Sequence, residues 1–131
     1  MITYSTTQIP ETEAIIEVYN SSGISRPTHD PERIRLMYVH ANLVVTAWDD
    51  HRLVGIARAL TDYCYSCYLS DLAVRKDYQN GGIGRKLIEL TREQAGERSN
   101  LLLLSAAGAM GYYPKIGFEK VENAFIVKRV R

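Results

Sequence analysis

The stretch from residue 70 to residue 90, SDLAVRKDYQNGGIGRKLIEL, places the strongest constraint on how this chain can fold. It predicts an apolar strand at 71–74, a polar turn, a glycine cluster (Gly81, Gly82 and Gly84) and then an amphipathic helix. The first N–H groups of a helix have no partner within it, and the helix dipole places partial positive charge there. Glycines lack the Cβ atoms that would keep a ligand away from these groups. The stretch therefore predicts a site for a phosphate or pyrophosphate group.

Composition limits the class of protein. The 131 residues suit one domain with its own core, and 46% of them are hydrophobic and 24% charged, as in a typical globular protein. Sixteen basic and 15 acidic residues give a formal net charge of +1, which offers no argument for nucleic acid or a membrane as partner. Residues 1–16 lack the pattern of a signal peptide, and no apolar run approaches the ~20 residues that span a bilayer. We therefore expect a single cytoplasmic domain over residues 1–131.

The two cysteines, Cys64 and Cys67, are spaced as CYSC. A zinc site would need two more ligands at a suitable spacing, and the three scattered histidines do not supply them. A redox-active pair of this spacing usually opens a helix, whereas this pair lies in a turn that leads into a strand. We expect two ordinary reduced thiols, with redox sensitivity as the alternative, and no metal site.

The rest of the chain predicts alternating elements of both kinds. Helices are expected at 10–19, 31–41, 82–95 and 109–115, and strands at 2–6, 43–48, 53–61, 67–74, 101–106, 118–121 and 124–130. The string LLLLSA at 101–106 is apolar on both faces, which is typical of a buried parallel strand and predicts a β-α-β unit over 67–106. The expected fold class is α+β (a three-layer α/β arrangement). Its mixed, mostly antiparallel sheet has six to seven strands and is flanked by three to four helices.

Two common phosphate-binding motifs do not fit the glycine cluster. The chain contains no GxxxxGK[ST] string. Gly82-Ile83-Gly84 is followed by Arg85, Lys86 and Leu87, so the third glycine of a dinucleotide-binding GxGxxG motif is missing. The acidic residue expected at the end of the following strand is missing too.

The string QNGGIG at 79–84 resembles the [Q/R]-x-x-G-x-[G/A] signature of the GNAT superfamily of N-acetyltransferases, which lies between a strand and a helix. The string YPKIGF at 113–118 is similar to the family's Y-x-K-L-G-F element, which follows the next strand. The strand SDLAV also matches the usual lead-in. The resemblance covers the whole chain in element order and residues 67–121 in detail.

The resemblance implies acetyl-CoA as the donor and a GNAT-like sheet with a central CoA-binding unit. By analogy, the loop's backbone N–H groups would hold the pyrophosphate, on Gln79, Asn80, Gly81, Gly82, Ile83 and Gly84. Backbone groups of Leu72 and Val74, on either side of Ala73, would pair with the pantetheine arm in a split between strands 67–74 and 101–106. Nearby positive charge would come from Arg75, Lys76, Arg85 and Lys86.

Acetyl transfer to an amine requires a neutral amine and a proton for the departing thiolate. A lysine-like ammonium with a pKa of about 10.4 is neutral in only about one molecule in a thousand near pH 7.4. Tyr113 occupies the family's general-acid position, with Tyr112 as the alternative if the register shifts by one. Asp71 lies where many relatives carry an acid. It is expected to bind the amine, to act as a base through water, or to be tied to nearby backbone.

The oxyanion donor is expected to be a backbone N–H at about residues 72–74, since no side chain stands out. Alternation along this strand places Asp71 and Ala73 on one face and Leu72 and Val74 on the other. Further polar candidates on the acceptor side are Glu17, His29, Asp30 and Asp62, each more typical of an ordinary surface residue. Other side chains available there are Arg26, Tyr63, Tyr65 and Tyr68.

The predicted function is transfer of an acetyl group from acetyl-CoA directly to a primary amine of a small molecule or peptide. Two alternatives stay open: a non-catalytic acetyl-CoA-binding module, and transfer to a protein amine. The apolar and basic residues of the string FIVKRVR at 125–131 suggest an exposed last strand that pairs in a homodimer.

Overall fold

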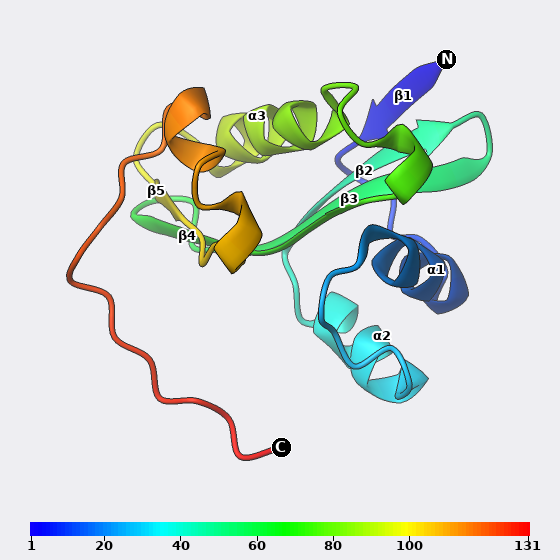
Figure 1. Ribbon diagram of the computed structural model, residues 1–131, viewed down its shortest axis with the longest axis horizontal. Coiled ribbons are helices and arrows are strands. Elements are labelled where there is room, and N and C mark those ends of the chain that lie inside the picture. Colours follow the sequence, from blue (N-terminus) through cyan, green and yellow to red (C-terminus); the bar gives the residue numbers. More distant parts are fainter.

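The structure, a computed structural model, describes residues 1–131 and has three layers (Figure 1). The middle layer is a five-stranded sheet with the strand order β1-β2-β3-β4-β5. Helix α3 covers one face, and helices α1 and α2 lie on the other (Figure 1). The bounds are β1 (Ile2–Ser5), α1 (Thr12–Ser22), α2 (Pro31–Val39), β2 (Leu43–Asp49), β3 (Arg52–Thr61), β4 (Ser66–Val74), α3 (Ile83–Ala95) and β5 (Asn100–Leu102).

Three of the four strand pairings are antiparallel, and β4 pairs with β5 in parallel. The β-α-β unit predicted for residues 67–106 is therefore present as β4, α3 and β5, and the mixed, mostly antiparallel α+β class is confirmed. None of the helices combines the length and apolar character needed to cross a membrane.

Successive side chains of the central strands point to opposite faces of the sheet and pack into an apolar cluster on each face. Val45 of β2 packs in the cluster that includes Leu87 of α3. Its neighbour Val44 packs with Ile56 of β3 in the cluster that includes Ile15 of α1. All five side chains are buried, so the sheet is covered on both sides, as the amphipathic patterns predict.

Gly55 of β3 allows α3 to approach the sheet closely. A Cβ atom at this position would lie 3.1 Å from both Ile83 Cγ2 and Leu87 Cδ1, which is closer than a side chain tolerates without displacing its neighbours. The first turn of α3 therefore rests directly on β3. This contact sets the depth at which the glycine loop before α3 lies.

The helix ends follow the predicted signals, with one correction. Asp30 caps α2, because its carboxylate accepts a hydrogen bond from the Arg33 N–H (3.2 Å), and α3 ends at Gly96. Helix α1 begins at Thr12 and runs through Ser22, later than the predicted 10–19 at both ends. The Ser22 hydroxyl donates to a carbonyl of its own last turn, so serine there continues the helix and the turn to Gly23 ends it.

The structure differs most from the prediction after β5. The expected strand at 101–106 is paired only to Leu102, and the side chains of Leu102 and Leu104 are exposed, so its predicted burial on both faces is wrong. The helix expected at 109–115 is replaced by two 3₁₀ turns, η2 (Ala107–Ala109) and η3 (Tyr113–Ile116).

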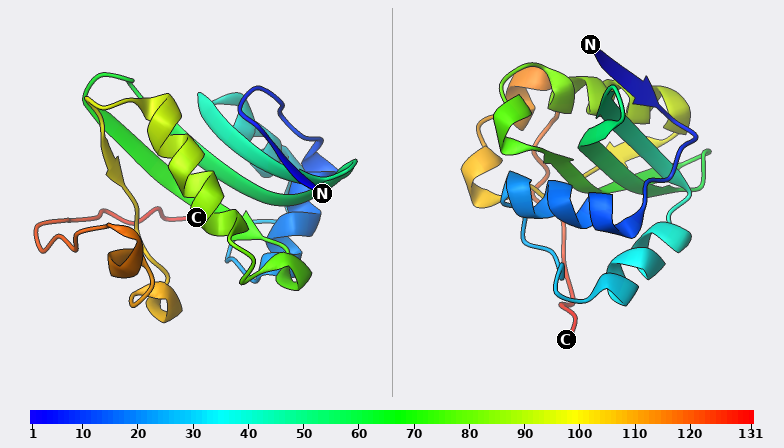
Figure 2. Two further views of the ribbon diagram at one scale, coloured as in Figure 1. Left: turned by 90° about the horizontal axis from the view of Figure 1, so that it is seen from above. Right: turned by 90° about the vertical axis from the view of Figure 1, so that its right-hand side faces the viewer.

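The strands predicted at 118–121 and 124–130 do not form, so the sheet has five strands instead of six or seven. The chain leaves the body after η3 and runs as an extended segment to its end below the sheet (Figures 1 and 2). We call residues 119–131 the tail: all of them are exposed, and none makes a main-chain to main-chain hydrogen bond. The residue types favour a strand, but a strand forms only where another strand lies beside it.

Candidate functional site

Strand β4 has an open edge over its second half. It pairs with β3 along its length, but its pairing with β5 ends at Tyr68, opposite Leu102. Beyond that point the side of β4 that faces away from β3 has no strand beside it. The Gln79 side chain donates to the Val74 carbonyl (2.9 Å) at the far end of this edge. The predicted split between the two strands is present, and an extended ligand can pair with the main chain there.

A β-bulge at Ser70 turns the side chains of β4. Asp71 lies opposite Arg58 of β3, but Leu69 lies opposite the next residue, Ala59, so Ser70 has no partner. Leu69 therefore packs in the cluster under α3, whereas Asp71 and the following Ala73 face α1. Leu72 and Val74 pack against the cluster under α3. The predicted alternation over 71–74 is thus present, and the bulge limits it to this half of the strand.

The glycine loop presents free N–H groups at the start of α3. The main-chain N–H groups of residues 80–85 have no hydrogen-bond acceptor within the protein. Asn80 and Gly82 have positive φ values of 69° and 87°, and a Cβ atom at Gly82 would meet nothing within 4 Å. Ile83 is buried and anchors the helix, whereas residues 79–82 are exposed. The loop therefore offers a set of unpaired donors to an anion in solvent.

The positively charged side chains near the loop differ in whether they are free to contact a bound anion. The buried guanidinium of Arg75 donates through Nε to the Leu53 carbonyl (2.6 Å), and its Nη2 lies 3.5 Å from a Glu17 carboxylate oxygen, so Arg75 is held by the body of the protein. The Arg85 side chain is exposed and pairs with Glu89, one turn later in α3 (3.6 Å). Lys76 and Lys86 are exposed, and their ammonium groups form no ion pair. Three of the four predicted charges therefore remain accessible.

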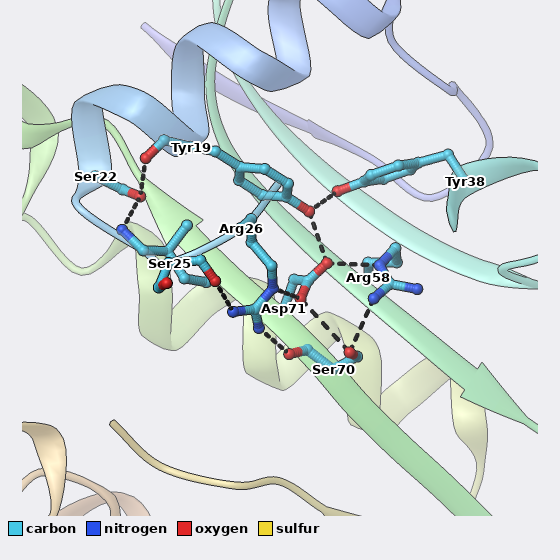
Figure 3. A network of polar contacts seen from close by, with 9 residues as sticks. Tyr19, Ser22, Ser25, Arg26, Tyr38, Arg58, Ser70 and Asp71 are labelled. Atoms are coloured by element: carbon cyan, nitrogen blue, oxygen red, sulfur yellow. Dashed lines mark hydrogen bonds and ion pairs between the residues drawn. The ribbon is translucent and has the colours of Figure 1, made fainter. Parts of the chain in front are cut away.

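Asp71 lies at the centre of a buried polar network (Figure 3). Its Oδ1 accepts from Arg26 Nε (2.5 Å), and its Oδ2 accepts from Arg58 Nε (2.6 Å) and from the Tyr19 hydroxyl (2.7 Å). The Tyr38 hydroxyl bonds to that of Tyr19, and since Tyr19 donates to Asp71, Tyr38 donates to Tyr19. The Asp71 side chain is fully buried, so its charge is compensated entirely by these neighbours.

The same two arginines hold the bulge. Arg26 Nη2 donates to the Ser70 carbonyl (2.8 Å), and Arg58 Nη2 donates to the Ser70 hydroxyl (2.9 Å). Arg26 belongs to the loop between α1 and α2, so the network ties this loop to the irregular part of β4 (Figure 3). With two guanidinium groups and one carboxylate, the network carries a net charge of about +1 near neutral pH.

Burial alone would raise the pKa of Asp71. The hydrogen bond and charge of Arg58 and the charge of Arg26 outweigh this effect, and the pKa of the carboxyl lies below its ordinary value. Burial raises the pKa of Tyr19, and its contacts with Tyr38 and Asp71 raise it further, so Tyr19 stays protonated. A carboxylate with a low pKa and three donors on its two oxygens is a weak proton acceptor.

Tyr113 opens η3 and is half-buried. Its ring contacts Phe118 and Tyr112 edge-on, with centroids 5.4 Å and 5.3 Å away. It packs against the same cluster as Leu72 and Val74, which places it on the α3 side of the open edge of β4. Burial and the nearby Tyr112 raise the pKa of Tyr113, so the hydroxyl keeps its proton at neutral pH. No hydrogen bond within the protein uses this hydroxyl.

Most other candidates for the acceptor side have structural partners. Asp30 caps α2 and Glu17 pairs with Arg75. Asp62 accepts from three main-chain N–H groups, two in the turn before β4 and that of Ser66 at the start of β4, which contributes most, and they lower the pKa of Asp62 to about 2. This turn, with the exposed Tyr63 and Tyr65, precedes β4, whereas the glycine loop follows it. His29 is exposed and Tyr68 is partly buried.

Sequence reasoning missed Arg58. The signal was present, because an arginine interrupts the otherwise apolar strand LVGIARALT, and a central strand rarely carries a charge without a partner. Tyr19 and Tyr38 were missed as well, and their hydroxyl groups extend the network. Across the whole chain, no three His, Cys, Asp or Glu side chains gather closely enough to hold a metal ion.

The two cysteines are free, with Cys64 exposed and Cys67 buried. Burial raises the pKa of the Cys67 thiol and lowers its reactivity. We expect a thiol-specific chromogenic disulfide reagent to label one thiol per native chain rapidly and the second only after denaturation. Two equally fast thiols in the native protein would contradict the burial of Cys67.

Comparisons with known proteins agree on one family. Residues 13–131 match the family model described as an acetyltransferase (GNAT) domain. Histone acetyltransferase TAP1 of Glycine max is 32% identical over 73 residues, which cover 54% of this chain and 32% of the relative. The uncharacterized N-acetyltransferase ycf52 of Porphyra purpurea is 26% identical over 97 residues, covering 68% of this chain and 55% of the relative. The chain spans about a third of the length of the first curated relatives it matches.

Solved structures show the same fold. A Staphylococcus aureus protein described as a probable acetyltransferase superposes with a TM-score of 0.84 at 24% identity, covering 98% of this chain and 100% of that chain. The ribosomal-protein-S18-alanine N-acetyltransferase of Escherichia coli superposes with a TM-score of 0.76 at 20% identity, covering 92% and 79%.

Proposed function

The chain belongs to the GNAT acetyltransferase family, and we propose that it moves an acetyl group from acetyl-CoA directly to a primary amine of a small molecule or peptide. One observation carries this proposal: the open edge of β4 leads into a loop whose N–H groups at 80–85 lack acceptors. An extended amide-containing arm suits the strand edge, and a pyrophosphate suits the loop. We propose that residues 1–131 act as one N-acetyltransferase domain and that this domain acts in the cytoplasm.

The donor would be held by main chain more than by side chains. Leu72 and Val74, on either side of Ala73, would pair with the pantetheine arm, and an N–H in this part of β4 would stabilise the oxyanion. The N–H groups around Gly82 would hold the pyrophosphate, with exposed Arg85 and Lys86 as added positive charge. The proposed pyrophosphate-binding set is Gln79, Asn80, Gly81, Gly82, Ile83 and Gly84.

Tyr113 is proposed as the general acid. When the amine nitrogen bonds to the acetyl carbon and the carbon–sulfur bond breaks, the sulfur needs a proton, and the Tyr113 hydroxyl, which is protonated at neutral pH, is able to supply it. Its lack of any hydrogen-bond partner within the protein leaves this hydroxyl available.

We propose that Asp71 positions the site instead of removing the proton of the amine. Its carboxylate is occupied by Arg26, Arg58 and Tyr19, and its pKa is lowered. The amine would then lose its proton to water. Weakly basic amines are favoured under this scheme: an α-amino group with a pKa of about 7.7–8.0 is neutral far more often at pH 7.4 than a lysine side chain. The rate with a given amine should rise about tenfold per pH unit below the pKa of that amine.

Replacement of Gly82 by alanine tests the donor site. The new Cβ atom lies where the anion approaches, and it strains a left-handed residue (φ +87°) by about 1–2 kcal/mol. We expect at least a tenfold loss of acetyl-CoA affinity by isothermal titration calorimetry. The matched control is Gly23→Ala, which strains a left-handed residue of nearly the same φ (+83°) at the end of α1 and should bind acetyl-CoA normally. An unchanged affinity in Gly82→Ala, or equal losses in both variants, would contradict the loop assignment.

A further inference from the structure

Arg58 keeps one nitrogen free although its side chain is only 10% exposed. Its Nε bonds to Asp71 and its Nη2 to the Ser70 hydroxyl, whereas Nη1 has no hydrogen-bond partner in the protein and points away from Asp71 (Figure 3). Every fully buried side-chain nitrogen or oxygen has a partner, so Nη1 reaches solvent. The guanidinium carbon lies 5.8 Å from the centroid of the Tyr38 ring, which supports its face. A nearly buried arginine therefore presents one free donor edge to the outside.

The charge of the network around Asp71 is not balanced within the protein. Arg26 and Arg58 share this one carboxylate, and neither forms an ion pair with another acidic side chain. The Arg26 side chain is 27% exposed, so the excess positive charge is not sealed from solvent. A further anionic group at Arg58 Nη1 would gain a charge-assisted hydrogen bond without displacing Asp71.

The surface beyond Arg58 is open and apolar. Leu60 follows Arg58 by two residues in β3 and lies opposite Tyr68 of β4, which in turn lies opposite Leu102 of β5. The residues on either side of Tyr68 pack under α3, so these three side chains face the side of the sheet on which α1 and α2 lie. Leu60 and Leu102 are 41% and 45% exposed, so neither helix covers them. The free edge of Arg58 thus lies where the covered part of this face meets an uncovered apolar part.

We propose that the acceptor carries a carboxylate as well as its primary amine, and that this carboxylate binds Arg58 Nη1 while the carbon chain lies on the surface formed by Leu60, Tyr68 and Leu102. The acceptor class is then that of amino acids, an assignment that rests on the proposed function. Arg58 lies opposite Asp71, which directly precedes Leu72, where the donor arm would pair. The bound carboxylate and the proposed reacting carbonyl would therefore lie along the same part of β4. Simple alkylamines and polyamines lack this anchor, and the net positive charge of the network disfavours them.

Matched acceptors test the proposal in the unaltered protein. Glycine, β-alanine and γ-aminobutyrate are each compared with their own amide, which has nearly the same size and no negative charge. We expect kcat/KM to be about tenfold or more higher for the acid in at least one pair, mainly through a lower KM, because only the acid forms the charge-assisted bond. Added chloride should raise the KM of that acid and leave that of its amide unchanged. Equal kcat/KM values within all three pairs would overturn the proposal.

A binding measurement separates failure of this assignment from failure of the proposed function. The acids and the amides are titrated into ¹⁵N-labelled protein without a donor, and the arginine Nε–H signals are followed by NMR. We expect a saturable shift of the Arg58 signal with an acid and none with its amide. Protein that shows this shift but transfers no acetyl group keeps the anion site and loses the proposed function. Acetylation of simple amines without a saturable shift for any acid keeps the proposed function and overturns the carboxylate site.

Replacement of Arg58 by methionine assigns the effect to this residue. The variant removes Nη1 and leaves Asp71 paired with Arg26 and Tyr19, and circular dichroism verifies its fold. We expect the preference for the acid over its amide to fall to about one, a ratio in which a general loss of activity cancels. The control Arg35→Met, at an exposed position of α2, should keep the full preference. A preference that survives in folded Arg58→Met overturns the assignment, and if the variant does not fold, the NMR titration of the unaltered protein decides.

Discussion

Replacement of Tyr113 by phenylalanine should lower kcat by about 10²–10³-fold while acetyl-CoA binds with unchanged affinity. The change removes only the hydroxyl, and the edge-on contacts of the ring with Phe118 and Tyr112 remain. General acids contribute about 10²–10⁴-fold to reactions of this kind, and the thiolate would leave without a proton donor. Thiol release measured over a panel of amines gives kcat, and calorimetry gives the affinity for the donor.

The pH profile adds a second readout for Tyr113. Burial raises the pKa of this hydroxyl above its usual value of about 10, so the protonated form persists through the neutral range. Activity should therefore fall only as the pH rises through that raised pKa, and this alkaline decline should be absent in the variant. Tyr112→Phe is the control, because Tyr112 is adjacent but more exposed, and its kcat should change less than about twofold. Undiminished turnover in Tyr113→Phe, or the full loss in Tyr112→Phe, would remove Tyr113 from the mechanism.

Replacement of Asp71 by asparagine should lower the free energy of unfolding by about 3–5 kcal/mol. The carboxylate is fully buried and compensates Arg26 and Arg58, and without it their guanidinium groups are left close together without a counter-charge. Urea denaturation followed by circular dichroism measures the change. The control is Glu32→Gln, which breaks an exposed, solvent-screened pair with Arg35 and should leave the urea midpoint nearly unchanged.

The stability of the network should also depend on pH. The pKa of Asp71 is lower in the folded protein than in the unfolded chain, where it is about 3.9. Its contribution is therefore complete above that unfolded value and is lost as the pH falls through the lower folded pKa. This part of the acid dependence should disappear in Asp71→Asn. A stable Asp71→Asn variant whose kcat falls at neutral pH and recovers at alkaline pH would instead make Asp71 a base.

The sequence predicted the local structure of one part of the candidate site. The glycine string, the helix it opens and the cap at Gly96 depend on residues close together in the chain, and the structure places them as expected. The network around Asp71 brings together Arg26 and Arg58, which are 45 and 13 residues away in the chain. Spacing does not predict such contacts. The Ser70 bulge adds to the difficulty, because a single unpaired residue reverses which face the side chains occupy.

The end of the chain shows a second reason why prediction from the sequence failed. The pattern of residues 118–130 is that of a strand, and the prediction of strands there was wrong because pairing depends on a neighbour that the sequence does not specify. The string LLLLSA was likewise read as buried because of its composition. Its burial depends on whether another strand covers β5, and in a single chain none does.

Gly55 of β3 affects the proposed donor site indirectly. The missing side chain on β3 lets the start of α3 lie close to the sheet, although Gly55 belongs to no part of the proposed donor site. A methyl group there would lie 3.1 Å from the side chains of Ile83 and Leu87 and would press on the first turns of α3, next to the unpaired N–H groups. A survey of the proposed donor site confined to residues 72–86 would therefore miss Gly55, the position that permits the close contact between α3 and β3.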